Sequence, residues 1–498
     1  MSNIWIKAQT LSAVFLCCFA GVVHADKSVN DSANDSANRS ASDSAAAISS
    51  EPKTVEDFIA LGLRGNQQLQ SVEFQAISAQ RALKAARTAY RPSISLNARY
   101  MRADGGRTIA FPIGDALNPV YQTLNGLTAG SSNPTQFPAI ENFEFNLMRE
   151  REQDTRLSLN TALYAPMVDA AIEAADARAN DANASREIYA RTLVRDIRRA
   201  YSGFGQAYAA TEVLKASVVL LQENLRVNAA LVKSGSATRD VELRANAELL
   251  AVQDRLQSSD NAMAAARRYL NFLVNRALDA PISDNPFSNK PSLDAVALVP
   301  KGNSGLRPEL TKLDANLALA HAGLSQAAAG AKPSIGFGLD VGTQGENYGF
   351  GRGKNFATAA IVLNWRLFDF GQTRAQKSSA AARISALQAE RVALMAQLEL
   401  AAKQASDDVA SASARIETAQ ARQLAAEEGF RIVARKRDAG AATQVEFLDA
   451  ERARTEAELA LYAAGFDRAN QLAELELALA AYPLPSSFIQ PNPLKELQ

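Results

Sequence analysis

Residues 90–99 of the chain read YRPSISLNAR, and residues 331–340 read AKPSIGFGLD. In both stretches a run of helix-forming residues ends at a proline, Pro92 or Pro333, and apolar residues then alternate with small or polar ones. Alternation with a period of two is typical of a β-strand with one buried face. Because the same helix-into-strand unit occurs twice, the sequence predicts an internal two-fold repeat.

Two further segments alternate in the same way, so four strands are expected. They are predicted at about residues 92–101, 155–165, 333–343 and 356–368. Each is about ten residues long, the length that a tilted strand needs to cross a bilayer. A half-buried sheet in a soluble protein would give the same alternation in any single strand. Four such strands in two hairpins favour a membrane sheet.

A sheet in lipid cannot have an open edge, because the backbone groups of an edge strand would have no hydrogen-bond partners. Four strands are too few to close, since the smallest barrels have about eight. The chain is therefore expected to build one barrel together with other copies of itself, and three copies would supply about twelve strands.

Long helices are expected to follow each pair of strands. Residues 372–428 contain neither glycine nor proline and are rich in Ala, Leu, Glu and Arg, which are strong helix formers. They predict one helix over about residues 371–438, and a similar run predicts another over about 166–234. Gly203 and Gly205 are soft points in the earlier helix, that is, positions where glycine would let it bend or break.

Each long helix is expected to end in a tight turn and to continue as a return helix. Gly235 lies in the first turn and Gly440 in the second, and glycine is the usual residue just past a helix end. Thr238 and Thr443 follow at the same spacing and are natural N-caps for the return helices. An ordinary coiled coil would contain similar hairpins, so the strands decide between the two readings.

The first residues have the features of a secretory signal peptide over positions 1–25, with a small-residue cleavage site at Ala25. Cys17 and Cys18 suggest a lipoprotein signal as the less favoured alternative. Residues 26–50 are rich in Ser, Asp, Asn and Ala, and predict a flexible leader because they can bury little apolar surface.

The composition argues against most kinds of chemistry. Both cysteines and one of the two histidines lie in the predicted signal peptide, which leaves His321 and no thiol. One histidine and no thiol are too few for a zinc site, a cysteine nucleophile or most catalytic triads. The formal net charge is +0, with no basic tract suited to nucleic acid. We therefore expect no enzyme activity, no cofactor, no metal site and no nucleic-acid partner.

These features resemble the TolC family of outer-membrane factors over about residues 54–482. The most specific matches are the two Pro-Ser-Ile strand starts, the junction LNWRLFDFG at 363–371, and the second hairpin at 440–450. The resemblance implies a mixed α/β membrane protein that forms a homotrimer. Its 12-stranded outer-membrane β-barrel, with 4 strands per chain, would continue into a long periplasmic α-helical barrel.

The resemblance also implies a function, that of an outer-membrane exit duct in a tripartite export system. The expected partners are a periplasmic adaptor (a membrane fusion protein), an inner-membrane transporter of the RND, ABC or MFS type, and outer-membrane lipid. The duct would passively conduct small molecules, as in drug or toxic-compound efflux, and type I secretion of polypeptides is the alternative. A trimeric coiled-coil adhesin or anchor is less favoured, because its strands would follow one another at the C-terminus. A soluble coiled-coil scaffold is disfavoured by the strands.

By the same resemblance, the turns of the two hairpins are expected to dock the adaptor. The tip residues are Gly235 and Ser236 in the first hairpin, and Gly440 and Ala441 in the second. Small residues at a tip allow another backbone to approach closely. The glycines also end their helices, which would account for them without any docking.

The pore constriction is expected near the second hairpin. Glu446 and Asp449 are three residues apart and share a helix face, so three copies would place both carboxylates around one narrow entrance. Arg437 stands where the family often has a tyrosine that helps to keep the entrance shut. Asp240, in the first hairpin, lies one residue earlier than a matching acidic pair would. Alone, an acidic pair on an exposed helix is usually a solvated face.

The predicted organisation has six parts. They are a signal peptide (1–25), a flexible leader (26–50), a first repeat (51–275), a Pro-rich equatorial linker (276–305), a second repeat (306–482) and a C-terminal periplasmic tail (483–498). The connection at about 102–154 is long and contains four prolines. It is expected outside the cell, with a plug inside the lumen as the alternative.

Overall fold

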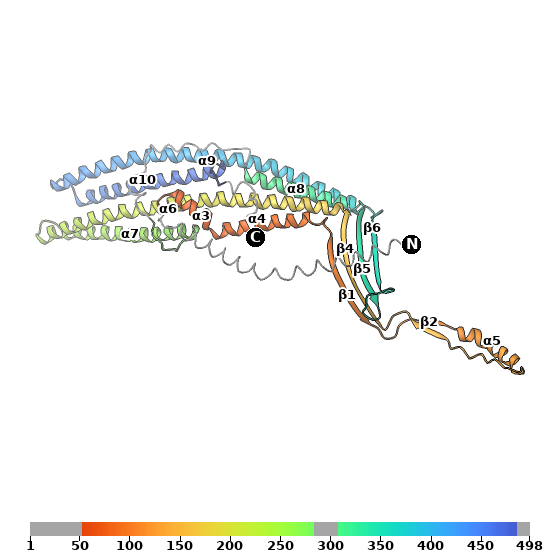
Figure 1. The fold of residues 1–498 in the computed structure, drawn as a ribbon. Helices are drawn as coiled ribbons and strands as arrows, with labels where there is room; N and C mark the ends of the chain where they lie inside the picture. Colours follow the sequence, from red (N-terminus) through yellow and green to blue (C-terminus); the bar gives the residue numbers. More distant parts are fainter. Residues whose placement is uncertain (1–51, 283–306, 486–498) are drawn as a thin grey trace. The chain divides into compact units, whose positions relative to one another are not determined.

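The computed structural model describes residues 52–282 and 307–485. The predicted signal peptide and leader, and most of the predicted linker and tail, lie outside the described residues. The chain divides into two compact units, which are described separately. The helical unit comprises Met1–Asn66, Leu193–Val299 and Ser406–Leu475, and the sheet unit comprises Gln67–Thr192, Pro300–Ala405 and Glu476–Gln498. Figure 1 shows the order of the elements along the chain.

Among the described residues, five helices lie wholly or partly in the helical unit. They are α3 (Val55–Gly65), the later part of α6 (Pro166–Lys233), α7 (Arg239–Leu273), the later part of α9 (Gln372–Asp438) and α10 (Gln444–Ala478). α6 starts with proline, whose missing N–H costs no bond at that position. It passes through Gly203 and Gly205 without interruption, so the suspected soft points are not breaks. None of the helices in the described parts of the chain is long and apolar enough to cross a membrane.

Apolar side chains from both hairpins form one core in the helical unit. Its buried members are Leu214, Val218 and Leu221 of α6, Leu249 and Val252 of α7, and Phe447 and Leu448 of α10. Phe430 and Val433 of α9 pack against this cluster. Complete burial of one such side chain is worth about 1.5–3 kcal/mol. The shared core therefore holds the α6–α7 and α9–α10 hairpins together.

Buried polar contacts fix the register between α6 and α10. The Ser217 hydroxyl donates to the Glu451 carboxylate at 2.6 Å, and Gln444 Nε2 donates to Asn224 Oδ1 at 2.7 Å. Glu451 is only 1% exposed. A slip of one helix along the other would leave these groups buried without partners, at a cost of about 1–3 kcal/mol each.

The short helix α3 starts at a capping box and lies close to α6. The Thr54 hydroxyl accepts the Asp57 N–H at 3.3 Å, and the Asp57 carboxylate accepts the Thr54 N–H at 2.9 Å. Hydrogen bonds from the backbone N–H groups of Thr54 and Lys53 lower the pKa of Asp57. Gly62 permits the close approach, because a Cβ there would lie 2.3 Å from Ile197 Cδ1.

The sheet unit contains all four predicted strands in one antiparallel sheet. They are β1 (Ser93–Arg102), β4 (Arg151–Tyr164), β5 (Ser334–Gly345) and β6 (Asn355–Asn364), in the order β1-β4-β5-β6. α4 (Gln67–Arg87) precedes β1, and α8 (Pro308–Ala329) precedes β5. Each of these two strands begins directly after a proline, Pro92 or Pro333. Within the chain, β1 and β6 each pair on one side only.

The pairing register gives the sheet one apolar and one polar face. One row across the strands runs Ile94, Leu159, Leu339 and Ala359, and the next row of the same face runs Leu96, Leu157, Val341 and Ala357. The row between them belongs to the opposite face and runs Ser95, Ser158, Asp340 and Thr358. Large apolar side chains such as Leu96 and Ile361 are each 71% exposed in the single chain. The alternation predicted from the sequence is confirmed by the register.

The fourth strand ends earlier than the sequence predicts. β6 stops at Asn364, and Trp365 and Leu367, which continue the alternation, lie outside it. The chain leaves the sheet here because it must turn into α9. Gly371 has a φ of 91°, and the Asp369 carboxylate accepts the N–H of Thr373 at 2.8 Å. Trp365 Nε1 donates to the Ala331 carbonyl at 3.1 Å and so ties the junction to the end of α8.

The connection between β1 and β4 is structured, where the sequence predicts a loop. It contains β2 (Thr108–Phe111), α5 (Ile113–Thr128) and β3 (Phe143–Asn146), and β2 pairs with β3 in a separate ribbon. Its prolines favour irregular chain, but Pro112 caps α5 and Pro119 lies inside it. The helix survives an internal proline because polar side chains on α5 bind the chain that follows it.

Candidate functional site: the tips of the helical hairpins

The first hairpin turns at a glycine in the left-handed conformation. Gly235 has a φ of 77°, and its N–H donates to the Val232 carbonyl at 3.0 Å. The next N–H, that of Ser236, donates to the Leu231 carbonyl at 2.9 Å. This pair of bonds is the Schellman pattern, which satisfies the last carbonyls of a helix and favours a residue without a Cβ.

The second hairpin repeats the same turn. Gly440 has a φ of 72°, and its N–H donates to the Arg437 carbonyl at 2.8 Å, while the Ala441 N–H donates to the Lys436 carbonyl at 2.7 Å. A Cβ built on either tip glycine would meet no atom within 4 Å. Both tips are therefore open at the glycine, and backbone strain alone opposes a side chain there.

The return helices start differently in the two hairpins. The Thr443 hydroxyl accepts the Glu446 N–H at 3.2 Å, and the Glu446 carboxylate accepts the Thr443 N–H at 2.7 Å. This reciprocal pair is a capping box. Thr238 forms no such pair: its hydroxyl caps no amide of α7, and Val241, which stands where the second hairpin has its glutamate, has no side-chain acceptor. The acidic candidate Glu446 thus has a structural contact of its own.

The capping contact also fixes the charge of Glu446. Its pKa is lowered, first by the hydrogen bond from the Thr443 backbone, then by that from the Thr443 hydroxyl, with a smaller effect of Lys436. Because the pKa of this carboxyl is lower in the folded state, it contributes stability to the fold at pH values above its pKa in the unfolded chain. That stabilisation is lost as the pH falls through the lower pKa of the folded state. Glu446 is therefore ionised at neutral pH.

Thr443→Ala is expected to loosen the first turn of α10, because it removes one side of the capping box. The loss is about 1 kcal/mol, which corresponds to roughly fivefold faster amide exchange in that turn. Thr238→Ala is the matched control, since its hydroxyl caps no amide of α7. Hydrogen-exchange mass spectrometry on the peptide after each turn measures both. Equal acceleration in the two variants would contradict the assigned role of the box.

Asp449 lies in a charged contact that joins the two return helices. Arg452 approaches Asp449 at 3.7 Å on its own helix and Glu248 of α7 at 2.6 Å. Asp449 is 66% exposed, whereas Glu248 is only 15% exposed. Part of the negative charge of this face is therefore offset by one arginine.

The other two candidates make local contacts. The Arg437 guanidinium lies over the Phe447 ring, 3.8 Å from its centre, and 3.5 Å from the Asp438 carboxylate. It thereby fastens the end of α9 to the first turn of α10. Asp240 accepts a hydrogen bond from the Thr238 hydroxyl and lies 3.8 Å from Arg244. Asp240 is exposed in the single chain.

Sequence reasoning missed several of these contacts. Thr443 and Glu446 have the spacing of a capping box, and that spacing is a signal available in the sequence. The pairing of Arg452 with Glu248 joins residues of different hairpins, and no local pattern reveals it. The structure brings Glu446, Asp449 and Arg437 to the same hairpin, and it places Asp240 in the other.

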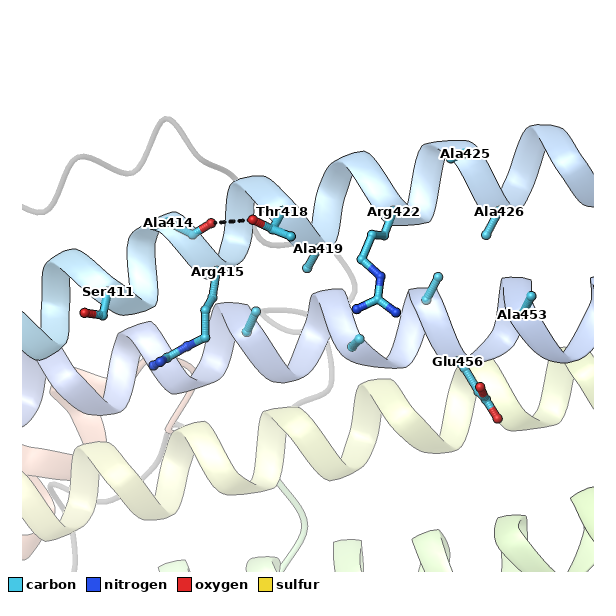
Figure 2. A pocket seen from close by; sticks show the side chains of 13 residues that line it. Ser411, Ala414, Arg415, Thr418, Ala419, Arg422, Ala425, Ala426, Ala453 and Glu456 are labelled. Atoms are coloured by element: carbon cyan, nitrogen blue, oxygen red, sulfur yellow. Dashed lines mark hydrogen bonds between the residues drawn. The ribbon is translucent and has the colours of Figure 1, made fainter.

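A groove of about 660 Å³ lies between α9 and α10, away from the tips. Figure 2 shows Arg415 and Arg422 extending from α9 toward α10. Arg415 pairs with Asp467 at 2.5 Å, whereas Arg422 and Glu456 form no ion pair with any described residue. The small residues that line it are Ala414, Ala419, Ala425 and Ala426 of α9, and Ala453, Ala457, Ala460 and Ala464 of α10. They let the two helix axes approach closely.

The polar face of the sheet carries charged and hydrogen-bonding side chains in one patch. The Ser158 hydroxyl donates to Asp340 at 2.5 Å, and Arg156 Nε donates to Asp154 at 3.0 Å. Among the residues that the structure describes, no group of three or more His, Cys, Asp or Glu side chains could hold a metal ion. The patch offers hydrogen-bonding groups that water can contact.

Comparison with known structures shows the same fold in several outer-membrane channels. The open-state MtrE channel of Neisseria gonorrhoeae matches with a TM-score of 0.68 at 20% identity, over 86% of this chain and 89% of that one. VceC of Vibrio cholerae matches with a TM-score of 0.67 at 17% identity, over 86% and 96%. The CmeC channel of Campylobacter jejuni matches with a TM-score of 0.67 at 13% identity, over 86% and 85%.

The sequence itself matches one family model, outer membrane efflux protein, over residues 304–481. No curated protein matches the chain. The matched range contains α8, β5, β6, α9 and α10, which form the second of the two helix-strand-hairpin halves. Residues 304–481 thus match the outer membrane efflux protein family, and the described chain has the fold of these outer-membrane channels.

Proposed function

We propose that the protein is a passive exit duct in the outer membrane, with its helical hairpins in the periplasm. One observation carries the proposal: a sheet with a continuous apolar face and two unpaired edges belongs to the same chain as two long helical hairpins. The likeness to outer-membrane channels and the match to an efflux family support it. The duct itself is not an enzyme.

The oligomer that we propose is a homotrimer. An unpaired strand edge in lipid leaves backbone groups without partners, at several kcal/mol per group, so β1 of one copy should pair with β6 of the next. Three copies close a 12-stranded barrel, in which the apolar face meets lipid and the polar face lines the lumen. Native mass spectrometry in detergent should give a trimer, and a stable monomer would contradict it.

We assign the hairpin tips to the periplasmic adaptor, which would link the duct to an inner-membrane transporter. Both tips are open, and their small residues admit another backbone. The pore constriction is placed just behind the second tip, at Glu446 and Asp449, with Arg437 and Asp240 beside it. Efflux of small toxic compounds is the favoured substrate class, and type I secretion of polypeptides is the second candidate.

Ser236→Arg and Ala441→Arg are expected to abolish export while trimers still form, because each places a bulky charge on a tip that must fit the adaptor. Export is measured as the accumulation of an efflux dye, in cells whose only copy carries the variant. Ser258→Arg, the same change at an exposed position within α7, is the control and should export normally.

A secreted-polypeptide reporter, read in parallel, distinguishes efflux from type I secretion. Normal dye export by both tip variants would remove the docking assignment and leave the duct itself intact. Failure of the unmutated protein to restore export of either cargo would reject the duct.

A further inference from the structure

The helix α5 exposes an apolar stripe with the spacing of a coiled-coil seam. Apolar residues recur at intervals of four, three, four and three, which are the d and a positions of a heptad. The exposed fraction of each is high for an apolar side chain in the single chain, from 37% to 76%. The members are Ile113, Leu117, Val120, Leu124 and Leu127.

One flank of α5, formed by its e and b positions, is already occupied by the chain that follows it. Asn118 donates to the Ile140 carbonyl and accepts its N–H, both at 2.8 Å. Asn125, two turns on, binds Phe137 in the same way, at 2.9 and 2.7 Å. A Cβ on Gly114 would lie 2.3 Å from the Ile140 carbonyl, so the fit is close. These contacts fix which face of the helix remains free.

Two backbone bonds and a short ribbon lie between the sheet and α5. Beyond the last pair of β1 and β4, the Ala103 N–H donates to the Glu150 carbonyl at 2.9 Å, and the Leu147 N–H donates to the Arg107 carbonyl at 2.9 Å. The β2–β3 ribbon follows, where Phe111 and Phe145 stack with their ring centres 5.6 Å apart. The helix is therefore attached at the end of β1 and β4 that is opposite to their connections with α4 and α6.

We propose that the α5 helices of three copies pack seam to seam as a three-helix coiled coil, which caps the outer end of the proposed barrel. This inference rests on the trimeric duct proposed above. Leucine at the a positions with β-branched residues at the d positions favours three- or four-stranded coiled coils over dimers. α5 has leucine at both a positions, 117 and 124, and Ile113 and Val120 at two of its three d positions.

The charges on α5 favour a second copy over a membrane surface as the occupant. Helices that lie on membranes carry lysine or arginine on the polar face. α5 has neither, and its one charged residue is Asp115, which lies at an f position away from the seam. Three α5 helices can therefore meet without burying a charge, and Pro119, at a c position, also stays outside the contact.

Single cysteines on α5 test the cap. The signal peptide would remove both native cysteines, so Val120→Cys and Gln122→Cys each leave one thiol in the mature chain. Val120 lies in the seam and Gln122 at an f position on the outside. Copper-phenanthroline oxidation of purified trimers should link Val120→Cys chains in pairs, at least tenfold more than Gln122→Cys chains. Linkage that is equal in the two variants, or absent from both, overturns the cap.

Further readouts separate the cap from the duct. Leu117→Asp/Leu124→Asp, added to Val120→Cys, should abolish the linkage and raise the open conductance in planar bilayers, while native mass spectrometry still shows trimers. Unchanged linkage or conductance in those trimers overturns the proposal. If lipid-borne quenchers quench a dye attached to the thiol of the Val120→Cys variant, the seam faces lipid, and the proposal is again overturned. If the unmutated protein is monomeric in detergent, the trimeric duct fails, and the cap fails with it.

Discussion

Leu96→Arg is expected to prevent assembly of the outer-membrane trimer, whereas Ser95→Arg, one residue earlier on β1, is expected to assemble. Leu96 lies near the middle of its strand, in the apolar row with Leu157 and Val341. An arginine on the lipid face costs about 2–4 kcal/mol at the middle of the bilayer. A trimer would carry that cost three times, roughly 6–12 kcal/mol, which is comparable to the whole stability of a typical domain.

Ser95→Arg is the control, because Ser95 and Leu96 lie on opposite faces of β1. Ser95 is exposed in the single chain and pairs with Ser158, whose hydroxyl binds Asp340. An arginine there would point to the polar face, near a carboxylate. Heat-resistant trimers in outer-membrane fractions, read on a semi-native gel, measure assembly. Normal trimers from Leu96→Arg would mean that the apolar face does not meet lipid.

The parts of the fold that local patterns specify could be predicted from the sequence. The strand faces follow from a period of two, and the two turns follow from Gly235 and Gly440 before a threonine. α9 runs over Gln372–Asp438, within one residue of the expected range. Long runs of strong helix formers and single apolar faces leave few alternatives, and this is why these predictions agree with the structure.

The remaining features depend on contacts between distant residues. The alternation around Trp365 favours a longer β6, because an alternating pattern does not reveal where the chain turns into α9. The prolines of α5 favour a loop, and the asparagine contacts that hold the helix reach residues 12 to 22 positions away. Glu248 and Arg452 are 204 positions apart, and their pairing appears only when both hairpins share a core.

Glu446→Gln/Asp449→Asn is expected to remove cation selectivity from the closed pore and to weaken block by multivalent cations by roughly tenfold, or about 1.4 kcal/mol. In the proposed trimer both residues are repeated around the threefold axis, and rings of carboxylates attract cations. Glutamine is also accepted at the third position of a capping box, so the double variant keeps the Thr443 contact. The change therefore tests charge with little effect on the helix.

Arg452→Gln is expected to have the opposite effect on cation block at the same entrance. Arg452 lies 3.7 Å from Asp449 and 2.6 Å from Glu248, so its removal frees two carboxylates and makes the entrance more negative. Block by a trivalent cation should then strengthen. Arg415→Gln is the control, because that side chain pairs with Asp467 in the groove away from the tips and not with a candidate ring carboxylate.

Single-channel recording on purified trimers, with a trivalent cobalt complex as the blocker, measures all of these variants. The acidic ring requires weaker block in Glu446→Gln/Asp449→Asn, stronger block in Arg452→Gln and little change in Arg415→Gln. Block that survives in the double variant would show that other groups line the constriction. Loss of block in Arg452→Gln would mean that the arginine positions the ring through Glu248 rather than offsetting its charge. The signs of the two changes therefore separate an electrostatic constriction from a structural one.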